Sequence, residues 1–333
     1  MSKVSLNVIA LEAGVSKTTA SMVLNGKGDQ HKINAATQER VKTIAQKLNY
    51  RPNQLARSFS QGKTMTIGLI VPNIADSYYS SIALYLEQKL AKSSYQLIIG
   101  STHEDPQKEK DLLLSFIDRR TDGILIASTQ KNKTDIEQVQ KGGTPVLLFD
   151  RHYPNSSLPY VIVDNYHGIK ILVDHLFKQG KRAIGYVGLD LDLDAIHERQ
   201  RGYRENYCDR FNMQTDYIRL INYDNYAQEC SIAVKELISQ RVSAIIFETH
   251  YLTLHGIKAL TEEHVRYPEQ VCIASYGDHE VFSIFSPYIT ALEQPARLIA
   301  EECAAKILDM IDTKSIHQSV EIKLKPQLII RNS

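Results

Sequence analysis

The feature that most constrains this chain is the pattern that begins at Thr66. From there on, short apolar segments alternate with stretches of helical periodicity. Segments that are apolar throughout predict strands buried on both faces, and intervening helices predict parallel sheets covered on both sides. The segments are TIGLIVP (66–72), QLIIG (96–100), GILIAS (123–128), PVLLFD (145–150), AIGYVG (183–188), SAIIFE (243–248) and VCIAS (271–275).

Residues 65–333 are more than one hydrophobic core normally serves. The α/β pattern therefore predicts two doubly wound, Rossmann-like subdomains. Ligands of such folds bind at the carboxyl ends of the strands. We expect a ligand cleft between the two subdomains.

Residues 1–50 show helical periodicity instead. Apolar stripes follow three candidate N-cap residues, Ser5, Ser16 and Asn34. Gly14 lies between the first two stripes, where a tight turn needs the positive φ that glycine adopts at little cost. Two short helices around a glycine turn, supported by a third, are typical of a helix-turn-helix module. The expected inward residues are Leu6, Ile9, Ala10, Ala13, Ala20, Val23, Leu24, Val41, Ile44, Ala45 and Leu48.

The net charge of +1 hides an asymmetry along the chain. Residues 1–60 hold nine Lys or Arg and three acids, so they carry +6 and the rest carries −5. A basic head on a mildly acidic body indicates a polyanion partner for the head alone. An ordinary three-helix cap with a solvated face is the alternative. The candidate DNA-contacting residues of the head are Ser5, Ser16, Lys17, Thr18, Thr19, Ser21, Met22 and Asn25.

Residues 51–64 read as a hinge and linker between this head (1–50) and the body (65–333). Pro52 disfavours helix in the residue before it, so the third helix ends near Asn49. Asn53 can cap a short segment, 54–61, that Gly62 stops. Eight residues are too few for a stable isolated helix, so we expect this segment to be helical only on DNA.

Several classes of protein lack their signatures in this sequence. No G-x-G-x-x-G or G-x-x-x-x-G-K-[ST] motif occurs, and no nucleophile–base arrangement is apparent, so we expect neither an enzyme nor a cofactor. The cysteines are Cys208, Cys230, Cys272 and Cys303; no pair has metal-ligand spacing, and reduced thiols are expected. Without an apolar N-terminal region or a long apolar run, we expect a cytoplasmic protein.

In the body, several polar residues lie at the ends of predicted strands, and others lie in the predicted helices that follow. Carboxylates accept hydrogen bonds from sugar hydroxyls, arginine offers a fork of donors, and tyrosine gives a flat face with one polar tip. Each of these side chains could instead form a surface salt bridge or a helix cap. The candidate effector ligands are Tyr78, Tyr79, Asp150, Arg151, Arg199, His250 and Asp278.

Two stretches carry a specific resemblance. SLNVIALEAGVSKTTASMVLN (5–25) and LNYRPNQLARSF (48–59) resemble the headpiece of the LacI/GalR family of bacterial repressors. The body is similar to that family's effector-binding core, which implies a periplasmic-binding-protein-like fold. STHEDP (101–106), RRTDGILIAS (119–128) and PVLLFDR (145–151) are most similar to sucrose operon repressors and fructose-type catabolite repressor–activators.

The resemblance also implies roles for the hinge. In the family a hinge helix lies in the minor groove, and a leucine wedges between base pairs. Phe59 matches that leucine, with Asn53 and Arg57 as further DNA contacts. Phe59 packing against the body is the alternative. Many members carry Arg where this chain has Met22, so its operator should differ from the lactose type.

Two departures concern the effector. The chain has Thr249-His250 and Gly277-Asp278 where many members carry additional carboxylates. Fewer acids make the cleft less hostile to an anion, so Arg151 and Arg199 would share a phosphate. A fructose-derived effector, with or without phosphate, is favoured over a neutral disaccharide. His250 is either an effector ligand or a satisfied, partly buried histidine.

These observations predict a sugar-responsive transcriptional repressor that binds a pseudo-palindromic double-stranded operator. The chain ends at QLIIRNS, which we place after the last strand. With no heptad tail, a homodimer is expected. The rivals are a sugar-binding protein without regulatory role, a sugar-handling enzyme, and a dual activator and repressor of central carbon metabolism.

Overall fold

A computed structural model of the chain describes residues 4–50, 62–209, 217–313 and 320–333. The contacts divide the chain into two compact units, Met1–Thr64 and Met65–Ser333. We call the first unit the headpiece and the second the core. The predicted hinge residues Asn53, Arg57 and Phe59 lie outside the described residues.

The headpiece contains three helices around a small apolar centre. Its buried residues are mostly those predicted, with Val41 and Ile9 fully buried. The predicted inward residues Leu6, Leu24, Ile44 and Leu48 are only partly buried and pack against that centre. The helices are α1 (Leu6–Glu12), α2 (Lys17–Leu24) and α3 (Ala35–Lys47).

Local sequence fixes the ends of these helices. Ser16 accepts a hydrogen bond from the backbone N–H of Thr19 (3.0 Å), and Asn34 caps α3 in the same way. Gly14 has a φ of +62°, as the turn requires. Ser5 stands at the N-cap position of α1 but its side chain makes no capping bond, so the capping predicted for Ser5 is wrong.

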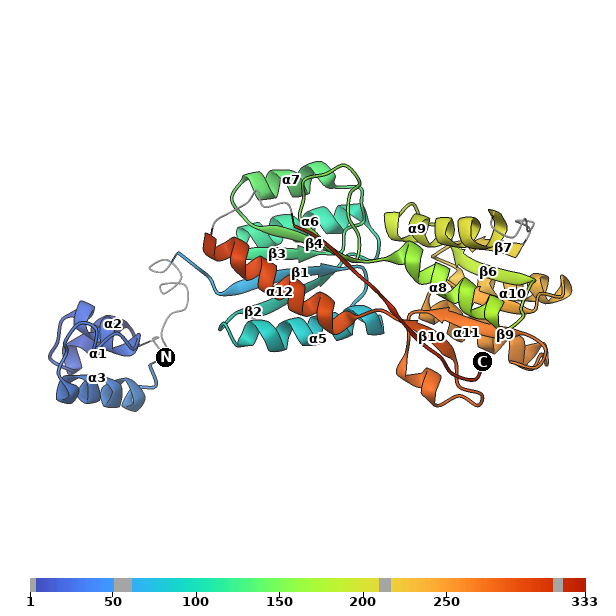
Figure 1. The fold of residues 1–333 in the computed structure, drawn as a ribbon. Helices are drawn as coiled ribbons and strands as arrows, with labels where there is room; N and C mark the ends of the chain where they lie inside the picture. Colours follow the sequence, from blue (N-terminus) through green and yellow to red (C-terminus); the bar gives the residue numbers. More distant parts are fainter. Residues whose placement is uncertain (1–3, 51–61, 210–216, 314–319) are drawn as a thin grey trace. The chain divides into compact units, whose positions relative to one another are not determined.

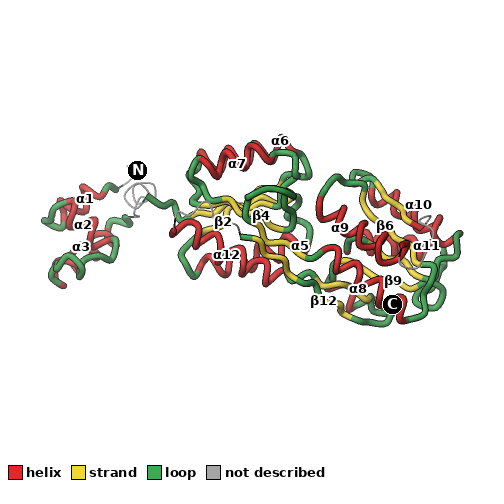
Figure 2. The backbone as a smooth tube through the Cα atoms, turned by 45° about the horizontal axis from the view of Figure 1, so that its top comes forward, coloured by secondary structure: helices red, strands yellow, loops and turns green. Residues whose placement is uncertain are grey.

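The core consists of two six-stranded sheets. Their strand orders are β11-β5-β4-β3-β1-β2 and β12-β10-β9-β8-β6-β7, so two doubly wound subdomains form as predicted. Figures 1 and 2 show both sheets between helices. The first sheet has β1 (Thr66–Val71), β2 (Gln96–Ser101), β3 (Gly123–Ile126), β4 (Val146–Phe149), β5 (Tyr160–Val163) and β11 (Glu321–Leu324). The second has β6 (Ile184–Leu189), β7 (Ile218–Ile221), β8 (Ala244–Phe247), β9 (Cys272–Tyr276), β10 (Thr290–Glu293) and β12 (Gln327–Ile329).

Helices cover both faces of each sheet. In the first subdomain α5 and α12 pack on one face while α6 and α7 pack on the other. In the second, α10 and α11 lie opposite α8. The helices are α5 (Ser77–Ala91), α6 (Pro106–Asp118), α7 (Lys133–Lys141), α8 (Asn165–Lys178), α9 (Asp194–Tyr203), η1 (Arg204–Asp209), α10 (Tyr226–Ser239), α11 (His250–Glu262), η3 (Glu280–Ser283) and α12 (Ala296–Thr313).

Apolar patterning identified seven strands and missed β5, β7, β10, β11 and β12. The missed strands at sheet edges carry polar and exposed residues, for example in the half-exposed pattern of β11. The expectation that the last strand precedes QLIIRNS is wrong, because β12 lies within it and pairs antiparallel with β10. The second sheet is therefore mixed, whereas the first is entirely parallel.

The chain crosses between the subdomains three times, a feature that the sequence did not predict. Crossings follow β5 and β10, and a third joins β11 to β12. In Figure 1 the C-terminal segment, in dark red, runs from the first sheet to the second, and only Lys325 and Pro326 separate β11 from β12. Each subdomain is therefore completed by residues distant in sequence, and their mutual movement must bend these three segments.

Candidate functional site

A cavity of about 390 Å³ lies between the two subdomains of the core. That volume falls within the roughly 300–1,000 Å³ typical of small-molecule sites. Of the predicted effector ligands, all but Asp278 line it. The side chains come from the ends of strands in both sheets and from the first turns of helices, as the rule for open α/β sheets requires.

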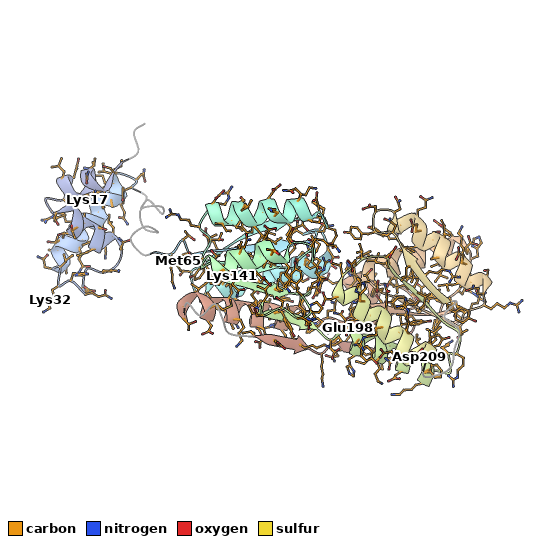
Figure 3. The ribbon with its side chains drawn as sticks, turned by 90° about the horizontal axis from the view of Figure 1, so that it is seen from above. Lys17, Lys32, Met65, Lys141, Glu198 and Asp209 are labelled. Carbon is orange, nitrogen blue, oxygen red and sulfur yellow. The ribbon has the colours of Figure 1, made fainter. Side chains whose placement is uncertain are left out.

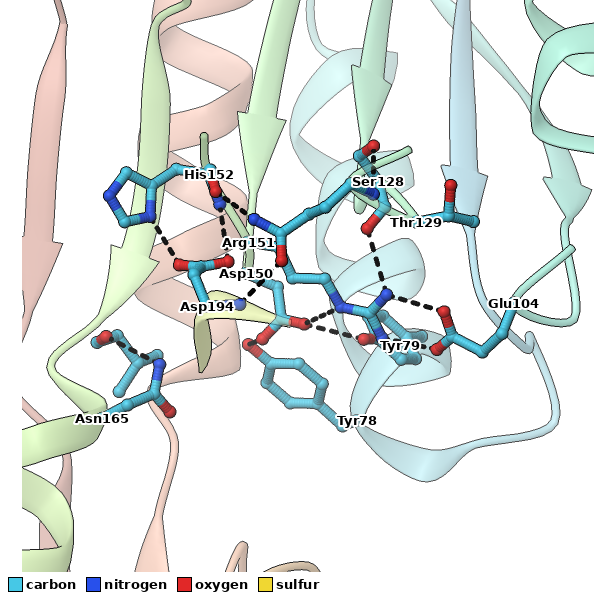
Figure 4. A network of polar contacts seen from close by, with 12 residues as sticks. Tyr78, Tyr79, Glu104, Ser128, Thr129, Asp150, Arg151, His152, Asn165 and Asp194 are labelled. Atoms are coloured by element: carbon cyan, nitrogen blue, oxygen red, sulfur yellow. Dashed lines mark hydrogen bonds and ion pairs between the residues drawn. The ribbon is translucent and has the colours of Figure 1, made fainter. Parts of the chain in front are cut away.

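Asp150 forms the centre of the first subdomain's contribution (Figure 4). Its carboxylate accepts hydrogen bonds from the hydroxyls of Tyr78 (3.1 Å) and Tyr79 (2.7 Å). Asp76 caps α5 through the backbone N–H of Tyr78 and thereby fixes the turn that carries both tyrosines. Burial raises the pKa of Asp150, and the cations Arg151 and Arg199 oppose that shift. The result is a buried acceptor with two aromatic rings beside it.

Arg151 also lines the cavity, but its guanidinium already has a partner. Its two terminal nitrogens donate to both oxygens of Glu104 at 2.8 and 2.6 Å, and one donates to the carbonyl of Ser128. Sequence reasoning did not identify Glu104 as part of the site, although it lies in the quoted segment STHEDP. A bidentate carboxylate partner leaves Arg151 less available to a phosphate than the sequence suggested.

Arg199 projects from α9 and supplies the second subdomain's cation. It donates to Asn165 Oδ1 (2.8 Å) and to the carbonyl of Glu248 (3.1 Å). Its guanidinium lies 4.0 Å from the ring centre of Tyr276. These two hydrogen bonds use two of the five N–H donors of the guanidinium, so the group keeps donors for a ligand. At 7% exposure Arg199 is a buried, oriented cation.

His250 joins the two subdomains across the cavity. Its Nε2 lies 3.2 Å from the hydroxyl of Ser77 and 3.7 Å from Asp76, while its ring stacks on His279. Burial lowers the pKa of His250, with Asp76 opposing the shift, which favours the neutral ring. The residue is thus both satisfied within the protein and exposed to the cavity. The neighbouring Thr249 caps α11 through the N–H of Leu252.

Asp278 does not reach the cavity. Gly277 takes a φ of +91° directly after β9, and the chain turns so that Asp278 forms a bidentate ion pair with Arg331 (2.8 and 2.7 Å). His279 lines the cavity instead. The sequence placed Asp278 at a strand end correctly but could not show which way the turn directs its carboxylate.

Several cavity residues were missed by sequence reasoning. An aromatic group made of Tyr223, Tyr226 and Tyr251 forms one part of the wall, with ring centres 5.1 to 6.2 Å apart. The first two follow β7, which apolar patterning did not detect. Tyr276, the last residue of β9, lies beneath Arg199. An aromatic residue at the end of a strand, or just beyond it, is the sequence signal that could have identified these cavity residues.

Outside the cavity, polar side chains link the subdomains (Figure 4). Asp194 accepts from the backbone N–H of His152 (3.3 Å) and bonds its ring Nδ1 (2.6 Å). Gln130 accepts from the N–H of Asp194 (2.7 Å) and donates to the carbonyl of His152. Lys131 forms an ion pair with Asp192 beside them. A residue of one subdomain thus caps α9, the helix that carries Arg199.

The headpiece has a polar hollow of its own, of about 420 Å³. The predicted residues Lys17, Thr18, Ser21, Met22 and Asn25 line it, together with three that sequence reasoning missed, Leu6, Lys27 and His31. The other three predicted residues are placed elsewhere. Ser16 and Thr19 bond each other through their hydroxyls (2.8 Å) in the cap of α2, and Ser5 is exposed at the start of α1.

Metal-ligand side chains, cysteines and apolar helices are the remaining features of the described parts of the chain. No group of three or more His, Cys, Asp or Glu side chains is placed there to hold a metal ion. The four cysteines are buried free thiols. None of the described helices combines the length and apolar character needed to cross a membrane.

Comparison with known proteins gives two family matches. Residues 5–53 match "Bacterial regulatory proteins, lacI family", and residues 173–333 match "Periplasmic binding protein-like domain". In solved structures, the lac repressor dimer bound to operator and the anti-inducer ONPF has the same fold, with a TM-score of 0.87, 20% identity and 99% coverage of both chains. A CelR–cellobiose complex has a TM-score of 0.72 with 25% identity over 99% of each chain.

Curated relatives cover nearly the whole chain. A fructose operon regulatory protein of Vibrio cholerae is 28% identical over 92% of this chain and 93% of its own length. A sucrose operon repressor of Klebsiella pneumoniae is 28% identical over 93% of each. A catabolite repressor/activator of Escherichia coli K12 is 26% identical over 92% of each. The chain therefore joins, in one polypeptide, a headpiece of the lacI family of bacterial regulatory proteins and a periplasmic-binding-protein-like core.

Proposed function

We propose that this protein is a sequence-specific repressor of carbohydrate-utilisation genes, of the sucrose or fructose type, that a sugar or sugar phosphate controls. The observation that carries the proposal is the buried Asp150 with its two tyrosine donors facing Arg199 across one cavity. This arrangement offers acceptors, donors and aromatic faces to a ligand rich in hydroxyls. The names of the fructose and sucrose regulators among its relatives agree with this ligand class.

The proposed DNA partner is a pseudo-palindromic operator, bound by a homodimer. The hollow around α2 supplies Lys17 for phosphates or guanine, hydroxyls for base edges, and Met22 for a thymine methyl. A two-fold symmetric dimer presents two such surfaces and therefore reads two related half-sites. The proposed site of action is the cytoplasm, where such operators are found.

The proposed effector is derived from fructose, and Arg199 is its main cationic ligand. Glu104 already binds Arg151 through both oxygens, so a phosphate shared between the two arginines would have to displace a carboxylate. Asp76 and Glu104 line the cavity together with Asp150, and these two add negative charge that the sequence argument did not include. We therefore assign a phosphate, where the effector carries one, to the Arg199 side of the cavity.

The proposed mechanism is a change in the balance between two arrangements of the core. A ligand touching Asp150 in one subdomain and Arg199 in the other binds best at one separation of the two. Differential affinity of a few kcal/mol is enough to reverse such an equilibrium. The subdomain movement then alters the spacing of the two headpieces in the dimer.

A second candidate function has one observation in its favour. Several relatives, including the Escherichia coli K12 protein, are named catabolite repressor/activator. A regulator that represses some promoters and activates others would use the same two sites, because the position of the operator decides the outcome.

Calorimetry against fructose, fructose 1-phosphate, fructose 1,6-bisphosphate, sucrose and sucrose 6-phosphate tests the effector class. We expect binding of fructose derivatives, and binding of phosphate esters alone would show that the effector carries a phosphate. Binding of sucrose in preference to the others would overturn the fructose assignment. Saturable turnover of any of these compounds would contradict a regulatory function.

Lys17→Ala tests the proposed DNA surface. A double-stranded operator is first selected from a random library with the wild-type protein. If Lys17 contacts a phosphate, its loss should reduce the slope of log affinity against log salt by about 0.9. Lys32→Ala is the matched control, because Lys32 is exposed but does not line the hollow; both lysines are labelled in Figure 3. Equal slopes for both variants would exclude the hollow as the DNA surface.

A further inference from the structure

Asn165 occupies an unusual position in the core. It is the first residue of α8 in the second subdomain, two residues after Val163, which ends β5 in the first. Its amide nitrogen donates to the carbonyl of Val163 (3.2 Å), a bond shown in Figure 4. With 4% exposure the side chain is buried, so its polar atoms must find partners within the protein.

The amide oxygen of Asn165 is shared by two groups of the cavity. It accepts from Arg199 Nε (2.8 Å) and from the hydroxyl of Tyr276 (2.7 Å). Both donors lie on other elements, α9 and β9. Since Arg199 also lies over the ring of Tyr276, one amide holds the cation and its aromatic support together.

The start of α8 also contacts the other crossing segments. Asp164 donates its backbone N–H to the carbonyl of Leu324 (2.8 Å) at the end of β11. A Cβ added at Gly168 would lie 2.7 Å from the side chain of Leu292 and 3.2 Å from that of Pro326. The three crossings therefore meet around the residues next to Asn165. A rotation of the subdomains must change the contacts at this point.

We propose that Asn165 is a positioning residue that holds Arg199 in its ligand-binding orientation and ties it to the crossing between the subdomains. Its oxygen fixes the guanidinium, and its nitrogen fixes the end of β5. A ligand that displaces Arg199 therefore also displaces the crossing segment after β5 through Asn165. This inference rests on the proposed function of the cavity and adds a path by which binding there would reach the hinge.

The orientation of Arg199 can be tested without any ligand. In ¹⁵N spectra the Arg199 Nε–H signal, assigned by its loss in Arg199→Lys, should exchange slowly with water in the wild type. In Asn165→Ala the acceptor is gone, and exchange should accelerate at least about tenfold. Asn165→Asp keeps an oxygen acceptor and should keep the signal protected. Asn206→Ala is the matched control, because Asn206 is a buried amide that donates to Gly202 and does not contact Arg199.

The tie to the crossing has a separate readout. With the tightest binder among the five sugars used as probe, Asn165→Ala should weaken effector binding about 10- to 100-fold, whereas Asn206→Ala should not. Asn165→Asp lacks the donor to Val163, so the effector should change operator affinity by a smaller factor than in the wild type.

Three results would overturn the inference. An Arg199 Nε–H that stays protected in Asn165→Ala would show that Asn165 does not hold it. Unchanged effector affinity in Asn165→Ala would also show that Asn165 does not hold Arg199. In Asn165→Asp, an effector-dependent change in operator affinity as large as in the wild type would exclude the tie to the crossing. If the wild type binds none of the five compounds, the proposed effector class fails, and the exchange experiment alone still decides whether Asn165 holds Arg199.

Discussion

Arg199→Ala abolishes the response to effector while operator binding without effector remains: this is the expected result with the largest functional effect. The side chain is a buried cation with donors left for a ligand, so we expect effector affinity to fall by about 100-fold or more. Calorimetry measures the affinity, and a gel-shift titration with and without effector measures the response. Arg199→Lys keeps the charge but loses the planar fork of donors. Its effector affinity should therefore lie between those of the wild type and of Arg199→Ala.

The control for this prediction lies two residues further along the same helix. Arg201 is exposed and pairs with Glu198 and Glu205, so Arg201→Ala should respond to effector like the wild type. Because Arg199 lowers the pKa of the buried carboxyls of Asp150 and Glu248, each variant must first be shown to be folded. A folded Arg199→Ala protein that is still induced would exclude the cavity as the effector site.

Glu248→Gln should raise the stability of the core at neutral and alkaline pH. Glu248 is fully buried at the end of β8, where it accepts from the hydroxyl of Tyr186 (2.6 Å) and the N–H of Leu189 (2.7 Å). Burial raises its pKa from 4.5 to about 7, although Arg199 and the two hydrogen bonds oppose the shift. A glutamine can accept from Leu189 and donate to the tyrosine oxygen, so the substitution keeps both contacts.

The sign of the pH effect follows from that raised pKa. The folded state holds the proton more tightly than the unfolded chain, so this group's stabilisation is complete below pH 4.5 and is lost as pH rises to about 7. The loss amounts to about 3 kcal/mol. Denaturant unfolding at pH 5 and pH 8 measures this effect. The free energy of unfolding of Glu248→Gln, relative to that of the wild type, should rise by about that amount from pH 5 to pH 8.

An exposed glutamate provides the comparison for the pH experiment. Glu262 lies on the surface of α11 near Lys258, and Glu262→Gln should follow the wild-type pH profile. If Glu248→Gln also runs parallel to the wild type, Glu248 is ionised in the folded protein throughout this range, and its carboxylate adds a permanent charge behind Arg199.

The sequence predicted the fold because the signals for it are local. Continuous apolar segments mark strands that are buried on both faces, and seven of them became strands of two sheets. Ser16 and Asn34 mark helix starts because a cap bonds a backbone group only a few residues away. Edge strands such as β11 and β12 escaped detection because none of the residues of β11 and β12 is fully buried and some of them are exposed, so no apolar run marks them.

Which residues share the cavity was also partly readable, since strand ends of a parallel sheet lie on one edge. That rule grouped Tyr78, Tyr79 and Asp150. It could not show that Asp278 turns away to Arg331, because a single φ after β9 decides the direction. A local pattern cannot encode the direction in which a turn sends a side chain when the partner lies more than fifty residues away.

Partners distant in sequence were decided by the tertiary structure alone. Glu104 binds Arg151, Asn165 holds Arg199, and Gln130 caps the helix that begins at Asp194. Glu104 and Arg151 meet beyond two strands of the first sheet, and Asn165 and Arg199 meet between α8 and α9 of the second subdomain. Gln130 and Asp194 meet across the two subdomains. By itself the sequence determined two modules, the helix starts and the seven strands that local patterns mark, and the chemistry available to them. The tertiary structure decided which charges neutralise each other and which remain for a ligand, because a buried charge takes whatever partner the packing places beside it.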